Sequence, residues 1–149
     1  IEFGKEKGIE VRFIEFMPLC GNGWNRDYFI PLVDVKKKIE QMYKLTNLKN
    51  DGVADRYSID GGGIVGFITT ISEPFCSSCS RLRLTARGTL RPCLFSTLEI
   101  NVFPLLRKVA PDEEIEKAIR KAVFMKPEWN PVLSGLEDPK KVFIRNIGG

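Results

Sequence analysis

The chain has 149 residues, of which 43% are hydrophobic, and this is enough apolar material for one globular core. Its net charge of +4 is mild and does not by itself indicate nucleic-acid binding, and no apolar run approaches the length of a membrane-spanning helix. Four cysteines without a signal peptide indicate a reducing compartment, so we expect the protein in the cytoplasm. The chain opens at Ile1 rather than at Met, and we interpret it as a cut or partial chain.

The first fifty residues predict the end of a larger α/β structure. We expect a helix to end near Lys7, with Gly8 as its cap, and a strand over 10–17. The strand is mostly apolar on both faces, which is typical of a buried parallel sheet. Arg12 and Glu15 interrupt it; they could form ion pairs with neighbours, but charged residues in a buried strand usually face a site. A helix end and one such strand cannot bury themselves, so we interpret 1–50 as the last unit or units of a barrel plus a connecting helix.

That connecting helix is predicted over 32–43, where Leu32, Val35, Ile39 and Met42 form one apolar stripe. The lysines between them most simply form a solvated face.

The rest of the chain, 51–149, predicts antiparallel strands followed by helices. A glycine-rich turn joins strands at 54–59 and 64–70, and a second hairpin joins 81–85 to 89–94 through Gly88. Asn101 can cap a helix that runs to about 109. A further helix over 111–125 has three acidic residues in its first turn, which suits the helix dipole.

Three cysteines with the spacing C-x2-C-x13-C are the main chemical signal: Cys76, Cys79 and Cys93. The hairpin between them can return the third thiol to the first two. Structural zinc takes four ligands, whereas this chain has no histidine and its fourth cysteine, Cys20, lies far upstream. A disulfide across C-x2-C would be tight. A three-cysteine [4Fe-4S] cluster with one open iron is the interpretation that we favour, and zinc or unliganded thiols stay open as alternatives.

Four arginines lie between the last two of these cysteines in the sequence. Arg81 and Arg83 alternate with Leu82 and Leu84, so on a strand both guanidinium groups would lie on one face and both leucines on the other. Arg87 and Arg91 follow nearby. A solvated basic face is the simple explanation. Because arginine forks match phosphate oxygens, we favour a phosphorylated ligand beside the metal centre.

Specific motifs across nearly the whole chain resemble one family. They are Arg12-Phe13-Ile14-Glu15-Phe16-Met17-Pro18, Gly21-Asn22-x-Trp24, Gly66-Phe67-Ile68, Phe75-Cys76-x-x-Cys79-x-Arg81-x-Arg83, Thr85-Ala86-x-Gly88, Cys93-Leu94-Phe95 and the final Gly148-Gly149. The family is GTP 3′,8-cyclase, molybdenum cofactor biosynthesis protein A, a radical S-adenosylmethionine (SAM) enzyme. The chain resembles its C-terminal part.

The resemblance implies an α/β fold: the C-terminal part of an incomplete, TIM-like α/β barrel, with an antiparallel sheet and helices that carry an auxiliary iron–sulfur cluster. In the family, a first [4Fe-4S] cluster on a C-x3-C-x2-C motif cleaves SAM to a 5′-deoxyadenosyl radical, which abstracts the ribose 3′ hydrogen of GTP before C3′ attacks C8. The second [4Fe-4S] cluster would be held by Cys76, Cys79 and Cys93, and its open iron would bind the purine.

The resemblance also assigns substrate contacts. Arg81 and Arg83 match residues that contact GTP, Arg12 is expected to do so, and Gly148 and Gly149 resemble a tail that reaches into the active site. Residues 51–149 would form the cluster- and GTP-binding region.

Departures from the family limit what the chain can do. It lacks the C-x3-C-x2-C motif, so the first cluster and SAM belong to a missing part, and the chain alone is expected to be inactive. The histidine that often follows the Lys-Pro at Lys126-Pro127 is absent. Expected partners are GTP, SAM through the missing part, cyclic pyranopterin monophosphate synthase downstream and possibly a second copy, with no nucleic acid and no membrane. A non-catalytic iron–sulfur or zinc module that binds a nucleotide stays open, as does a nucleic-acid-binding zinc domain.

Overall fold

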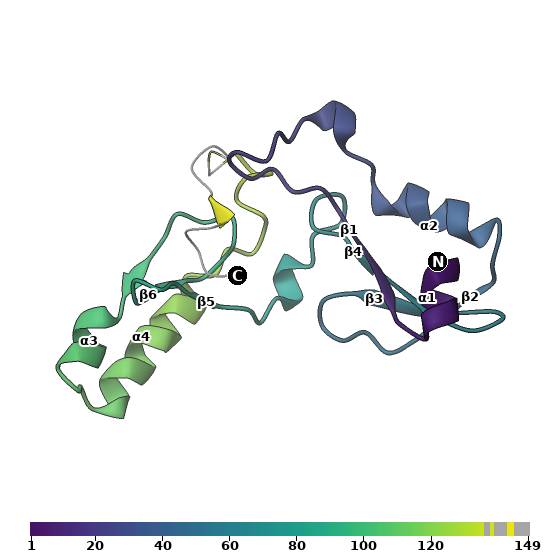
Figure 1. The fold of residues 1–149 in the computed structure, drawn as a ribbon. Coiled ribbons are helices and arrows are strands. Elements are labelled where there is room, and N and C mark those ends of the chain that lie inside the picture. The colour runs from purple at the N-terminus through teal and green to yellow at the C-terminus, as the bar shows by residue number, and fades with distance from the viewer. Residues whose placement is uncertain (136–137, 139–142, 145–149) are drawn as a thin grey trace. The chain divides into compact units, whose positions relative to one another are not determined.

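The computed structural model describes residues 1–135, 138 and 143–144, and these form a mixed α/β structure (Figure 1). The chain divides into two compact units. Unit 1 contains Ile1–Met17 and Asn25–Cys79, and unit 2 contains Pro18–Trp24 and Ser80–Gly149. The predicted division near residue 50 was a division by function and stays a prediction. Gly148 and Gly149, the predicted active-site tail, lie outside the described residues.

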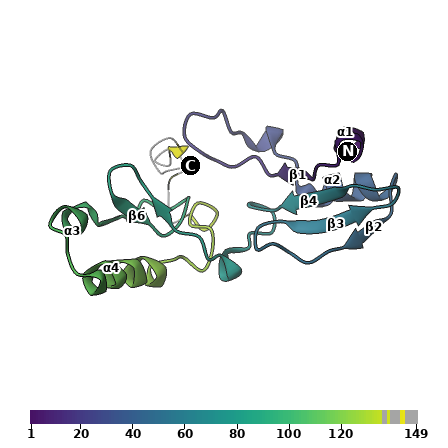
Figure 2. The same cartoon turned by 60° about the horizontal axis from the view of Figure 1, so that its bottom comes forward.

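Unit 1 is a four-stranded sheet with one long helix and one short helix. The strand order is β1-β4-β3-β2, in which β1 runs parallel to β4 and the other pairs are antiparallel (Figure 2). The bounds are α1 Glu2–Lys7, β1 Val11–Ile14, α2 Leu32–Glu40, β2 Leu45–Asn47, β3 Asp55–Ile59 and β4 Ile64–Ile68, with a 3-10 turn at Arg26–Tyr28. Leu32 and Ile39 of α2 pack against Ile59, Val65 and Phe67 of the sheet, and this cluster is the core of the unit.

The strand β1 has the parallel pairing that its sequence predicts, and it lies at the edge of the sheet. Among the described residues, its outer side has no strand partner. One face of β1 is also exposed, since Ile14 is 54% exposed and Arg12 lies on the same side of the strand; the apolar pattern on both faces predicts burial only within a larger sheet. The barrel itself stays a prediction.

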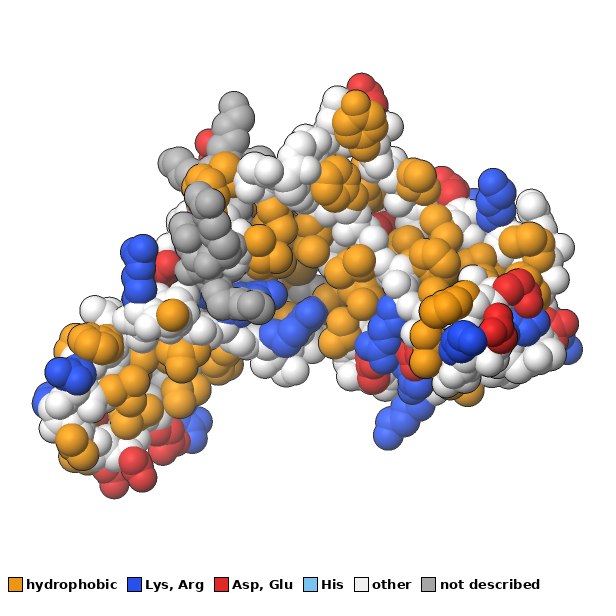
Figure 3. Space-filling model, in the orientation of Figure 1, with side chains coloured by type: hydrophobic (Ala, Val, Ile, Leu, Met, Phe, Trp, Pro, Cys, Tyr) orange, Lys and Arg blue, Asp and Glu red, His pale blue; other side chains and the backbone are white. Residues whose placement is uncertain are grey.

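Unit 2 consists of a small antiparallel sheet and two helices. The strand order is β5-β6-β7, and the bounds are β5 Arg83–Leu84, β6 Thr89–Arg91, β7 Ile100–Asn101, α3 Phe103–Arg107 and α4 Asp112–Phe124. Leu90, Val102 and Ala122 form its buried core. Apolar side chains are also exposed on α3, on α4 and between them, where Figure 3 shows them in orange; the most exposed are Val109, which lies between the two helices, and Phe124 at the end of α4.

The turn of the β5–β6 hairpin depends on Gly88. Its φ of 73° suits glycine, and its carbonyl accepts hydrogen bonds from the amides of Val102 (2.8 Å) and Phe103 (3.0 Å). The side chain of Asn101 also accepts from the Phe103 amide at 3.0 Å, but the N-cap residue of α3 is Val102, so the prediction that Asn101 is the cap is wrong by one residue. The hairpin turn is therefore tied to the next helix along the chain.

Most predicted elements are confirmed in type, but their grouping differs from the prediction. The strands predicted over 54–94 form two separate sheets rather than one, and the short strands β2 and β7 were not predicted. The predicted helices over 32–43 and 111–125 are present as α2 and α4 with slightly shorter bounds. In the part of the chain that the structure describes, no helix has the length and apolar character that a membrane crossing requires.

Candidate metal centre and the arginines near it

Cys76 and Cys79 lie in a single tight turn. A 3-10 turn covers Cys76–Ser78, and the Cys79 amide donates to the Cys76 carbonyl at 3.2 Å. Both cysteines are half-buried thiols, while Ser77 and Ser78 between them are exposed. The turn therefore presents two sulfurs three residues apart, which is the local arrangement that C-x2-C predicts for two ligands of one metal centre.

Cys93 follows β6 and lies in a second turn. The amide of Phe95 donates to Cys93 Sγ at 3.4 Å, and the amide of Ser96 donates to the Cys93 carbonyl at 3.4 Å. Phe95 and Ser96 are buried, whereas Cys93 is half-buried. A backbone N–H directed at sulfur stabilises an anionic thiolate, and such hydrogen bonds are among the features that tune cluster ligands. The three cysteines are thus of the residue type that binds iron–sulfur clusters.

The three cysteines come from both units. Cys76 and Cys79 end unit 1, and Cys93 belongs to unit 2. Within residues 1–135, 138 and 143–144, the structure gathers no set of three His, Cys, Asp or Glu side chains that could hold a metal ion. The three-cysteine ligand set therefore stays a prediction. Cys20 is half-buried in the segment Pro18–Trp24 of unit 2, and its exclusion from the ligand set also stays a prediction.

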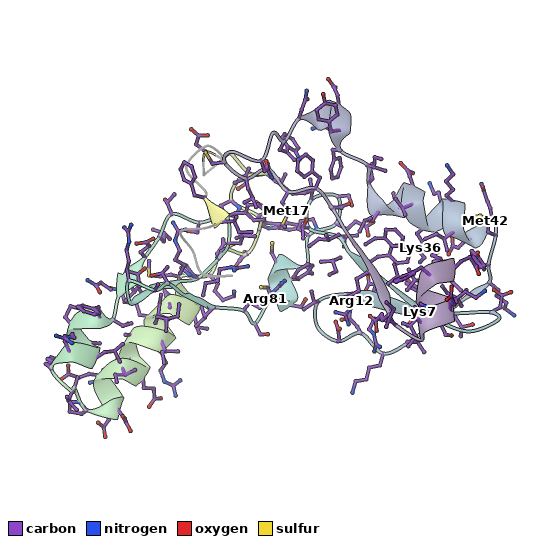
Figure 4. All side chains as sticks on the ribbon, viewed as in Figure 1. Lys7, Arg12, Met17, Lys36, Met42 and Arg81 are labelled. Atoms are coloured by element: carbon purple, nitrogen blue, oxygen red, sulfur yellow. The ribbon has the colours of Figure 1, made fainter. Side chains whose placement is uncertain are left out.

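Arg81 and Arg83 lie at the start of the β5–β6 hairpin, and Figure 4 labels Arg81. Regular strand geometry begins only at Arg83, so Arg81 precedes the ladder. Leu84 lies opposite Leu90 and so on the same side of the sheet, and Leu82 packs against the core cluster that contains Leu90. This agrees with the prediction that the two leucines share one face, although Leu84 is 56% exposed. Because Arg81 precedes the ladder, the prediction that the two guanidinium groups lie on the same side stays a prediction.

Arg83 faces another arginine across the hairpin. Its partner in the ladder is Arg91, whose Nε lies 2.9 Å from Glu99 Oε1. Opposite residues of an antiparallel pair lie on the same side of the sheet, so two arginine side chains share one side of this hairpin. Glu99 offsets the charge of Arg91, which is only 7% exposed. Nothing in the sequence around Glu99 indicated this pairing.

Arg12 lies in a network of charged side chains on unit 1 (Figure 4). Its Nε donates to Glu10 Oε1 at 2.7 Å and its Nη2 to Asp51 Oδ2 at 2.5 Å, while Arg56 also donates to Glu10. The amides of Ala54 and Val53, followed by Arg12, lower the pKa of Asp51 to about 2. Arg12 is therefore already paired with carboxylates, and a phosphate ligand would have to compete with them.

Glu15, which the sequence also marked as a charge in a buried strand, has a structural role. Its side chain is 2% exposed. Oε1 accepts from the Leu32 amide at 3.1 Å and from the Ser72 hydroxyl, and Oε2 accepts from the amides of Ile71 (2.6 Å) and Ser72 (2.9 Å). Burial raises the pKa of Glu15, but these hydrogen bonds outweigh burial and the pKa is lowered overall. The carboxylate thus joins the end of β1 to the start of α2 and to the loop after β4.

The described residues define a mixed α/β protein that carries a two-cysteine turn, a third cysteine with an amide hydrogen bond to its sulfur, and a basic hairpin beside it. Residues 9–131 match the family described as Molybdenum Cofactor Synthesis C, and the chain belongs to this family. This confirms the resemblance indicated by the sequence motifs.

Relatives with assigned names support the same conclusion. The chain is 39% identical to the GTP 3′,8-cyclase of Syntrophomonas wolfei over 100% of its own length and 47% of that protein. It is 40% identical to the enzyme of the same name from Desulforamulus reducens, covering 97% of the chain and 46% of the relative. The mitochondrial GTP 3′,8-cyclase of Arabidopsis thaliana is 39% identical, and the alignment covers 100% of the chain and 39% of the relative. The chain therefore spans less than half the length of these relatives.

Proposed function

We propose that the chain is the C-terminal part of a GTP 3′,8-cyclase that acts in molybdenum cofactor biosynthesis. In this proposal, Cys76, Cys79 and Cys93 hold a [4Fe-4S] cluster, and Arg81 and Arg83 bind GTP. The observation that carries the proposal is the hydrogen bond from the Phe95 amide to Cys93 Sγ at the end of a basic hairpin, because hydrogen bonds to sulfur are typical of the cysteines that hold iron–sulfur clusters. The names of the relatives supply the substrate, and the description of the family supplies the pathway.

The residues of this chain bind and orient the substrate. A three-cysteine cubane supplies, when bound, one iron that is open to a donor atom of a ligand. Arg81 and Arg83 would bind phosphate oxygens through their planar forks. Glu99 pairs with Arg91 and so limits the repulsion between Arg91 and the opposite Arg83. The hairpin can therefore place an arginine fork near the cysteines without an uncompensated pair of like charges.

Conversion of GTP to (8S)-3′,8-cyclo-7,8-dihydroguanosine 5′-triphosphate needs more than this chain. The 149 residues contain no C-x3-C-x2-C motif, so a SAM-cleaving cluster would bind elsewhere, and the chain alone should not turn over GTP. Arg12, and the tail residues Gly148 and Gly149, complete the proposed substrate contacts. Binding by Arg12 requires that it exchange Glu10 or Asp51 for a substrate group.

Binding of GTP, GDP and guanosine to the anaerobically reconstituted chain tests the assignment of the arginines. Each charge-assisted hydrogen bond contributes about 1.5–3 kcal/mol, so Arg81→Ala or Arg83→Ala should weaken GTP binding about ten- to a hundredfold. Guanosine affinity should change little, and Arg→Lys at either position should recover only part of the loss. Arg120→Ala is the matched control, since Arg120 lies on the exposed surface of α4 and pairs with Glu116.

Two outcomes would reject the proposal in different ways. If the variants lose guanosine and GTP affinity equally, the arginines do not bind phosphate, and the basic hairpin is a solvated surface. If the purified chain holds zinc and no acid-labile sulfide, a zinc module that binds a nucleotide becomes the better description.

A further inference from the structure

Lys126, to which neither the sequence motifs nor the proposed function assigns a role, contacts both segments that lead to the cysteines. Its Nζ donates to the carbonyl of Arg81 at 2.7 Å and to the carbonyl of Pro92 at 3.0 Å. Arg81 lies two residues after Cys79, and Pro92 immediately precedes Cys93. Lys126 itself is half-buried and follows the end of α4. One ammonium group therefore joins two backbone segments that are distant from it in sequence.

These two carbonyls lie where the β5–β6 ladder can no longer hold the hairpin together. The last regular pair toward the cysteines is Arg83 with Arg91. In the same register, the next pair would place Pro92 opposite Leu82; this is a non-hydrogen-bonded position, because the Thr85 amide donates to the Thr89 carbonyl and hydrogen-bonded pairs alternate along an antiparallel ladder. A lysine ammonium has three donors and no acceptor, so it can bind two carbonyls at once. Lys126 thus links the two chain segments beyond the last regular pair of the ladder.

We propose that Lys126 is a positioning residue for the metal centre: it fixes the open end of the β5–β6 hairpin and thereby the backbone that leads from Cys79 and into Cys93. This inference rests on the proposed function, since it assumes that these cysteines are ligands. Without Lys126, the segments on either side of the cysteines would separate more readily, and a bound cluster would be lost faster.

The rate at which an iron chelator removes the cluster measures this effect. The rate is monitored by visible absorbance of the anaerobically reconstituted 149-residue chain. Lys126→Met keeps the length of the side chain but removes the donors, and it should lose the cluster at least about tenfold faster than the wild type, since two charged hydrogen bonds are removed. Lys126→Arg, which retains charge and paired donors, should recover part of the loss. Lys121→Met, on the exposed surface of α4, is the control and should match the wild type.

A measurement without metal separates this inference from the proposed function. In the cluster-free chain, amide hydrogen exchange at Phe95, which donates to Cys93 Sγ, should be faster in Lys126→Met than in Lys121→Met. If neither the wild type nor any variant binds a cluster, the proposed function fails. The exchange rate of the Phe95 amide then decides by itself whether Lys126 fixes the hairpin. If Lys126→Met does not fold, Lys126→Gln, with its single uncharged amide, replaces it in both measurements.

The inference is overturned if the Lys126 variant matches Lys121→Met in cluster loss and in Phe95 exchange. It is also overturned if Lys126→Arg loses the cluster as fast as Lys126→Met, because a merely structural loss of packing would then explain both.

Discussion

Replacing Glu15 with glutamine should destabilise unit 1, although the two side chains have nearly the same shape. The best orientation of the amide places its oxygen at the Oε2 position, where it can still accept from Ile71 and Ser72. The NH₂ group then faces the Ser72 hydroxyl, to which it can donate, and the Leu32 amide, where two donors meet in place of a donor and an acceptor. The substitution removes one charge-assisted hydrogen bond, leaves a buried donor unsatisfied and weakens the two remaining bonds.

The size of the effect follows from those contacts. A hydrogen bond to a charged group contributes about 1.5–3 kcal/mol, and an unsatisfied buried donor costs about 1–3 kcal/mol. Partial recovery through the amide oxygen lowers the total, so we expect a loss of about 2–4 kcal/mol in the free energy of unfolding. Amide protection at Leu32 should fall by about thirty- to several hundredfold, because 1.4 kcal/mol corresponds to a factor of ten.

The effect should also depend on pH. The folded pKa of Glu15 is lowered from its ordinary value of 4.5, so its stabilisation is fully present above pH 4.5 and is lost as the pH falls through the folded pKa. Wild type and Glu15→Gln should therefore converge in stability at low pH and differ most near neutrality.

Hydrogen exchange by NMR at Leu32, Ile71 and Ser72, combined with urea unfolding, measures these effects. Glu6→Gln is the control, because Glu6 is largely exposed on α1 and forms a surface ion pair with Lys7. That variant should change stability by less than about 0.5 kcal/mol. Unchanged protection at Leu32 in Glu15→Gln would show that the carboxylate does not anchor the start of α2.

Two further predictions concern the hairpin turn and the network around Arg12. Gly88→Ala should destabilise unit 2 by about 2 kcal/mol or more in urea unfolding, because its φ is positive and a Cβ would lie 2.8 Å from Phe103 Cβ. Gly135→Ala is the control: its φ is similar but a Cβ would enter open space, so the loss of stability should be smaller. Asp51 should titrate by NMR near pH 2, and Arg12→Ala should raise that midpoint only slightly, since the backbone amides are the larger cause; a midpoint near 3.8 in the wild type would contradict the structure.

Local periodicity and turn residues were sufficient to predict much of the fold. The apolar stripe of α2 predicts which face packs on the sheet, and the glycines at 61–63 predict the β3–β4 hairpin. The strands β2 and β7 are two or three residues long, so they contain too little of a period-two pattern to be recognised. The division into two sheets depends on long-range pairing, which no local pattern records.

The candidate site was only partly predictable for the same reason. The C-x2-C spacing predicts the turn at Cys76 and Cys79, because that turn is local. The contacts of Lys126, the pair Arg91–Glu99 and the anchoring role of Glu15 join residues that are distant in sequence or have no motif. The position of the Arg81 side chain could not be predicted from strand alternation, because the ladder begins only at Arg83.

Iron and acid-labile sulfide in single cysteine variants test the central assignment most directly. After anaerobic reconstitution of the 149-residue chain, wild type and Cys20→Ala should hold one oxygen-sensitive [4Fe-4S] cluster, as measured by metal and sulfide analysis and by EPR of the reduced protein. Cys76→Ala, Cys79→Ala and Cys93→Ala should each lose it, because a cubane needs all three thiolates of this set. A cluster that persists in Cys93→Ala but is lost in Cys20→Ala would contradict the assignment.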